Sequence, residues 1–148
     1  MKDLELAKQT LHADARAFVL VKDERVLACG TRDGIGELLD TLDWLGEAAR
    51  GASLADKVVG KAVAQVAVHA GLRAIYTPLA SEAARRVLDL AHISLDADHV
   101  ILLILNKRGD GACPMERLTA PLDSPHDAVN ALREFVEAQH AHVVARAP

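Results

Sequence analysis

The chain has 148 residues, of which 51% are hydrophobic, and its formal net charge is −4. This length suits a single domain spanning 1–148, and the negative charge gives no general attraction for nucleic acid. No apolar run approaches the ~20 residues of a membrane span, no signal-peptide pattern is present, and two cysteines make no disulfide framework. We therefore expect a cytoplasmic domain without membrane or nucleic-acid partners.

The first third of the chain predicts a helix, a hairpin and a second helix. The apolar segments 17–21 and 25–29 flank the polar turn 22–24, which is typical of an antiparallel hairpin. A glycine-bearing loop at 31–36 leads into the second helix. The apolar residues at helical spacing are, in the first helix, Leu4, Ala7 and Leu11, and, in the second, Leu38, Leu39, Leu42 and Leu45.

The stretch Ser53–Leu72 predicts the central helix of the fold. Ser53 and Asp56 have the spacing of a capping box, and Gly71 is a natural stop. The face that repeats at helical spacing consists of Ala55, Val58, Val59, Ala62, Val63, Val66, Ala67 and Ala70.

Three local costs occur near the start of this predicted helix. Lys57 faces the positive end of the helix dipole, and Lys61 repeats the charge four residues later. Gly60 between them costs about 1 kcal/mol relative to alanine in a helix. Because local rules are most often broken at functional sites, this start is predicted to be one.

The second half of the chain alternates strands with helices. A strand at 73–77 is predicted to stop at Pro78, and the apolar run 100–105 predicts a strand buried on both faces. Between them Ser81 caps a helix whose inner face is Ala84, Val87, Leu88 and Ala91.

A polar turn at 106–111 and a loop at 112–116 follow the last predicted strand. Ser124–Asp127 opens the final helix with a cap, a first-turn proline and an acid. The tail from His140 onward is expected to be loose. This order indicates an α/β sandwich with a mixed sheet, in which the hairpin is antiparallel and the two helix-separated strands are parallel.

Several motifs resemble an uncharacterised prokaryotic family. They are V-L-V-K-D at 19–23, A-D-K-V-V-G-K-A at 55–62, S-E-A at 81–83, the turn at 106–108 and C-P-M-E at 113–116. The family is a domain of unknown function in the cytidine-deaminase-like superfamily, and the resemblance runs from Ala17 to the last helix. It implies a three-layer α-β-α fold and no established activity.

The active members of that superfamily use a zinc-bound water, held by the motifs H-x-E and P-C-x-x-C. By position, Asp56-Lys57 stands where the first motif would begin, and the segment from Pro78 to Glu82 stands where the second would. Neither carries a soft ligand set. We expect no metal and no cofactor, so the fold would be kept without the zinc chemistry.

The candidate ligand-binding residues lie at two predicted helix starts, where partnerless N–H groups favour an anion. They are Asp56, Lys57, Gly60 and Lys61 at the first, and Ser81 and Glu82 at the second. The structural alternatives are ordinary: an acid in a capping box, solvated lysines, a serine cap and a first-turn acid.

Cys113 and Glu116 are candidate catalytic residues. Cys113 lies in a polar loop near Lys107 and Arg108, a setting that lowers a thiol pKa, although a cysteine is often a buried small hydrophobe.

Three functions remain open. The first and favoured one is a module that binds a nucleotide or another small anion. The second is a thiol enzyme that uses Cys113, assisted by Glu116 or a nearby lysine, on a nucleoside-like or acyl substrate. The third is a structural role or a role in forming a homo-oligomer. Exposure of the Cys113 sulfur in a pocket is the feature that separates the second from the first.

Overall fold

The structure, a computed structural model, describes residues 2–32 and 34–146, with side chains placed as far as residue 139. Residue 33, in the predicted loop before the second helix, and the side chains of His140 and His142 lie outside this description. No helix within the described ranges is long and apolar enough to cross a membrane. In chain order the elements are α1 (Lys2–Ala13), β1 (Phe18–Lys22), β2 (Arg25–Gly30), α2 (Gly36–Leu45), the 3-10 turn η1 (Gly46–Ala49), β3 (Ser53–Asp56), β4 (Val58–Val59), α3 (Lys61–Ala70), β5 (Ala74–Ser81), α4 (Glu82–Leu90), β6 (Ser94–Ile101), α5 (Pro114–Thr119) and α6 (Pro125–Arg146).

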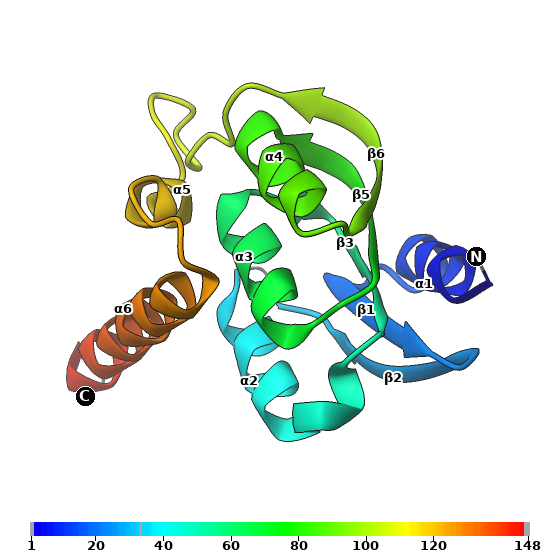
Figure 1. Cartoon of the computed structure of the whole chain (residues 1–148). Helices are drawn as coiled ribbons and strands as arrows, with labels where there is room; N and C mark the ends of the chain where they lie inside the picture. Colours follow the sequence, from blue (N-terminus) through cyan, green and yellow to red (C-terminus); the bar gives the residue numbers. More distant parts are fainter. Residues whose placement is uncertain (1, 33, 147–148) are drawn as a thin grey trace.

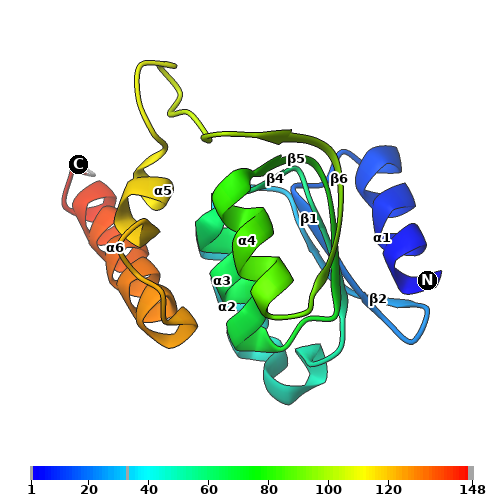
Figure 2. The same ribbon diagram turned by 45° about the horizontal axis from the view of Figure 1, so that its top comes forward.

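The strands form one mixed sheet between two layers of helices, which confirms the predicted fold class (Figure 1). β1 pairs antiparallel with β2 and with β3, whereas β5 runs parallel to β3, β4 and β6. Figure 2 shows α1 alone on one face of the sheet and α2, α3 and α4 on the other, with α5 and α6 outside them. The hairpin and the parallel pair formed by β5 and β6 are as predicted.

β3 and β4 are two parts of one strand line. Ser53 pairs with Ala74 and Val58 pairs with Leu79, so both parts keep the same register along β5. The interruption falls at Lys57, where β5 carries Pro78, a residue with no N–H to donate. This also explains why β5 continues through Pro78, where the sequence predicted its end.

The predicted start of the central helix is therefore wrong. Ser53–Asp56 is a strand, because it is paired with β1 on one side and β5 on the other, and this pairing overrides the capping-box pattern. α3 begins only at Lys61, with Gly60 as its N-cap, and ends at Gly71 in the left-handed conformation, as predicted. Lys57 is not part of the helix, so the expected repulsion between Lys57 and Lys61 within one helix does not arise.

The strand predicted at 100–105 is also displaced. β6 is Ser94–Ile101 and ends where β5 ends, because its length is set by pairing with β5. The rest of the apolar run is not buried: Leu102 is 84% exposed, Leu103 43% and Leu105 54%.

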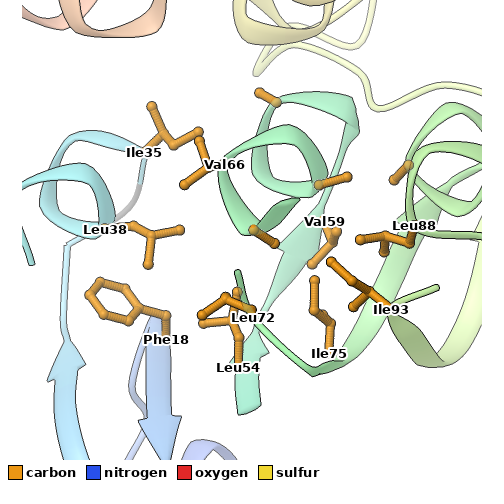
Figure 3. Packing of buried hydrophobic residues seen from close by; sticks show 14 of the residues in the cluster. Phe18, Ile35, Leu38, Leu54, Val59, Val66, Leu72, Ile75, Leu88 and Ile93 are labelled. Atoms are coloured by element: carbon orange, nitrogen blue, oxygen red, sulfur yellow. The ribbon is translucent and has the colours of Figure 1, made fainter. Parts of the chain in front are cut away.

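The main hydrophobic core lies between the sheet and α2, α3 and α4. Figure 3 shows Phe18 of β1 next to Leu38 of α2, and Ile75 of β5 next to Ile93. A smaller cluster joins α1 to the other face through Leu4, Ala7 and Leu11.

Two further elements concern the end of the chain. The predicted loop at 112–116 runs into a short helix, α5. α6 begins as predicted, with the Ser124 hydroxyl accepting from the Asp127 N–H at 3.3 Å, and its backbone stays helical through the predicted loose tail to Arg146.

Candidate functional site

A cavity of about 440 Å³ lies beside the interruption between β3 and β4. β1 begins at Phe18, opposite Asp56, so β4 extends past it without a neighbouring strand on that side among the described residues. The cavity lies at the carboxyl end of β3, and open α/β sheets bind ligands in the crevice outside the carboxyl ends of their strands. The cavity is lined by residues of four regions: the start of β1, the loop that leads into α2, the segment from the end of β3 into α3, and the segment before and within α5.

Asp56 is the last residue of β3 and lines the cavity. Its Oδ1 accepts a hydrogen bond from the Val58 N–H at 3.3 Å, and this contact spans Lys57, the residue at which the strand line is interrupted. Burial raises the pKa of this carboxyl to about 7, against the lowering effect of the N–H groups of Val58 and Lys57. A carboxyl with such a pKa can both accept and release a proton near neutral pH.

Lys57 is exposed at the edge of the same cavity. Its N–H donates to the Ala17 carbonyl at 3.2 Å, which joins the interruption to the chain just before β1. Lys57 takes part in no ion pair with the residues that the structure describes.

The start of α3 does bind a carboxylate, and the protein itself supplies it. Glu116 of α5 is buried, and its Oε1 accepts from the Lys61 N–H at 2.6 Å. A Cβ on Gly60 would lie 1.7 Å from that oxygen, so glycine is required for this approach. Burial raises the pKa of Glu116, while the Lys61 N–H and charge act in the opposite direction.

The Lys61 side chain does not line the cavity. Its Nζ donates to the Ala120 carbonyl at 2.9 Å and lies 3.6 Å from Asp123 Oδ1. Lys61 is thus a structural partner of the segment that follows α5.

Ser81 and Glu82 are not brought to the cavity wall. The buried Ser81 hydroxyl accepts from the Ala84 N–H at 3.1 Å, so it is the predicted cap of α4. Glu82 pairs with Arg85 at 2.8 Å. Both residues occupy the structural roles that the sequence offered as alternatives.

Cys113 lines the cavity and is partly exposed. It precedes Pro114 as the N-cap residue of α5, and its N–H donates to the Ile104 carbonyl at 2.9 Å. The structure therefore groups Asp56, Lys57, Gly60, Cys113 and Glu116 around one cavity.

Two basic residues of the cavity wall, Arg32 and Lys107, are absent from the candidates chosen by sequence. The Arg32 Nε is held by Glu37 at 3.2 Å, and Glu37 also accepts from the Thr31 and Arg32 N–H groups. The signals that could have found them are the glycine-bearing loop before α2 and the polar turn at 106–111, where Lys107 was considered only for its effect on the Cys113 thiol.

The donor set does not fit the zinc site of the deaminase superfamily. The α3 start carries Gly60 and Lys61 and is capped by Glu116, and the α4 start carries the buried cap Ser81. Within the described part of the chain, no group of three or more His, Cys, Asp or Glu side chains is placed to hold a metal ion.

The family model TM1506, "Domain of unknown function (DUF1893)", matches residues 6–136. The crystal structure of a DUF1893 family protein, TM1506 from Thermotoga maritima, is 20% identical and has a TM-score of 0.82, covering 90% of this chain and 89% of that one. RibD from Acinetobacter baumannii is 18% identical with a TM-score of 0.51, covering 65% and 35%. A diaminohydroxyphosphoribosylaminopyrimidine deaminase/5-amino-6-(5-phosphoribosylamino)uracil reductase from Thermotoga maritima is 17% identical with a TM-score of 0.43, covering 80% and 39%.

No curated protein matches the chain. The similarities to TM1506 and to RibD show the fold alone, an α/β domain with a mixed sheet.

Proposed function

This chain belongs to the TM1506 family (DUF1893), and we propose that it binds a nucleotide or another small organic anion in the cavity beside β4. The observation that carries the proposal is the lining of the cavity, which combines apolar side chains with three basic ones. Its volume of about 440 Å³ is in the range of small-molecule sites.

The charge of the cavity favours an anion. Arg32, Lys57 and Lys107 line it together with two carboxyls, Asp56 and Glu116. Burial raises the pKa of both carboxyls, and the value of about 7 for Asp56 means that part of the Asp56 negative charge is removed near neutral pH. The basic side chains are then in excess.

The proposed anion contact differs from the one expected from sequence. The Lys61 N–H at the α3 start is already bound by Glu116, so we place the anionic group at Lys57 and Lys107. Apolar walls from Phe18 and Ile35 would take the uncharged part of the ligand.

Lys57→Met and Lys107→Met are each expected to weaken nucleoside monophosphate binding by roughly 3- to 10-fold, since a charge-assisted contact at a partly solvated site is lost. Isothermal titration calorimetry on a panel of monophosphates, with the matching nucleosides, measures this. Lys2→Met is the matched control, because Lys2 is an exposed lysine of α1 on the other face of the sheet. Equal binding by both cavity variants and the control would contradict the proposed anion contact.

A second candidate function is nucleophilic catalysis by Cys113. The observation in its favour is that Cys113 lines the same cavity as Asp56, whose pKa of about 7 suits a general base. A pure binding module predicts instead that Cys113 packs as a small apolar residue, so that Cys113→Ala costs modest stability and leaves ligand affinity nearly unchanged.

Cys113 is expected to react with iodoacetamide faster than Cys29, which lies on β2 and packs against the small cluster under α1. Peptide mass spectrometry over a time course compares the two thiols in one sample. Protection of Cys113 alone by a bound monophosphate supports the thiol function, and equal slow labelling of both cysteines argues against it.

A further inference from the structure

One segment of the chain, residues 102–123, covers the cavity and is called here the covering segment. Five lining residues come from it: Ile104, Lys107, Cys113, Met115 and Glu116. Figure 2 shows its first part as an extended connection from the end of β6 to α5, which lies outside the layer formed by α2, α3 and α4. The cavity wall on this side therefore depends on how the segment is held.

The covering segment is held mainly by polar contacts. The buried residues of α5 are Glu116 and Thr119, both polar, and its apolar residues Met115 and Leu118 are only partly buried. α3, by comparison, buries Ala62, Ala64, Val66 and Ala67. An element that buries so little apolar surface can separate locally at low cost in free energy.

The polar contacts form a reciprocal clamp between α3 and the covering segment. The Glu116 Oε1 accepts a hydrogen bond from the Lys61 N–H at 2.6 Å, and the Lys61 Nζ donates one to the Ala120 carbonyl at 2.9 Å. One turn further along α3, Gln65 Nε2 donates to the Leu122 carbonyl at 2.6 Å. These contacts therefore attach both α5 and the chain that follows it to α3.

The clamp is incompletely satisfied, and its ends are exposed. Gln65 is buried, yet its Oε1 has no hydrogen-bond partner among the residues that the structure describes. At the first end of the covering segment Leu102 is 84% exposed, and at the other end the Asp123 side chain is fully exposed. Side chains at these two ends are therefore not packed in a way that would hold the covering segment rigidly against the cavity.

We propose that the covering segment is a lid that opens and closes the cavity, and that Lys61 and Gln65 of α3, together with Glu116, are its latch. The proposal rests on the proposed function only for the kind of molecule that enters. Opening detaches α5 from α3 and leaves the sheet and the main core in place.

Access to Cys113, which lines the cavity within the covering segment, tests the lid without any ligand. In a Cys29→Ser background, the rate of labelling by iodoacetamide is compared with that by a 5-kDa polyethylene glycol maleimide. We expect Lys61→Met and Gln65→Met each to raise the ratio of bulky to small labelling about fivefold, because each removes one contact that favours the closed state. Lys2→Met, at an exposed lysine of α1 on the other face of the sheet (Figure 2), is the control and should leave the ratio close to that of the parent.

Native-state amide hydrogen exchange distinguishes a lid from a loss of overall stability. In Lys61→Met and Gln65→Met, exchange should rise within residues 102–123 while the amides of β5 stay protected. An unchanged labelling ratio in both variants, or an equal rise of exchange in β5, would overturn the lid. Neither outcome depends on nucleotide affinity, so the proposed function is judged separately.

Discussion

Asp56→Asn is expected to stabilise the protein near pH 8 and to have little effect near pH 3. Burial holds the carboxyl pKa at about 7, compared with 3.8 for the free group, so the folded state binds the proton more tightly than the unfolded state does. The contribution of this carboxyl to the free energy of unfolding is therefore fully present below pH 3.8, and it is lost as the pH rises to about 7. At 1.36 kcal/mol per pKa unit, the shift from 3.8 to about 7 amounts to about 4 kcal/mol, which asparagine recovers.

Urea unfolding at several pH values measures this effect, because the free energy of unfolding of the parent should fall with pH more steeply than that of the variant. Asparagine keeps an oxygen that can accept from the Val58 N–H, so the turn at the strand interruption is preserved. Asp14→Asn, at an exposed residue just after α1, is the matched control. Parallel pH profiles for parent and Asp56→Asn would show that Asp56 is not the group responsible.

Gly30→Ala is expected to destabilise the protein by roughly 3 kcal/mol, at the upper end of the cost of overpacking a core. Gly30 pairs with Phe18 across the hairpin, and a Cβ there would lie 2.2 Å from the Phe18 Cε1 atom. The ring cannot move aside freely, because Phe18 is 2% exposed and belongs to the main core. Thermal and urea unfolding measure the loss.

The ring of Phe18 also lines the cavity, so its displacement by Gly30→Ala should weaken ligand binding as well. Gly111→Ala is the control, since a Cβ at Gly111 meets only the Asn106 Nδ2 at 3.7 Å. In a Phe18→Leu background the Gly30→Ala change should cost less, because the two residues are in contact. An equal cost in both backgrounds would show that the clash with the ring is not the cause.

In the proposed function, the strand interruption lies at the centre of the binding site. Asp56, the last residue of β3, has a carboxyl pKa of about 7, and Lys57 follows it at the edge of the cavity. Across the cavity, Glu116 holds the covering segment to α3. In this proposal, the charge of the cavity, access to it and the stability of the fold all depend on a few residues within and beside the strand line of β3 and β4.

The sequence by itself determined the elements whose signals are local. The hairpin follows from two apolar segments around a polar turn, and Gly71 ends α3 because glycine adopts the left-handed conformation freely. Ser81 and Ser124 cap α4 and α6 with their own hydroxyls, within three residues of the N–H groups that they bind. In each case the pattern and the interaction lie within a few residues of each other.

The tertiary structure alone decided the features that depend on distant partners. Ser53–Asp56 became a strand because β1 and β5 pair with both of its edges, and β6 ended with β5 and left Leu102 exposed. The carboxylate at the α3 start comes from Glu116, 55 residues away from Lys61. Local patterns singled out several residues that line the cavity, but pairing and burial between distant segments decided which side chains reach it, because the free energies of pairing and burial exceed local propensities.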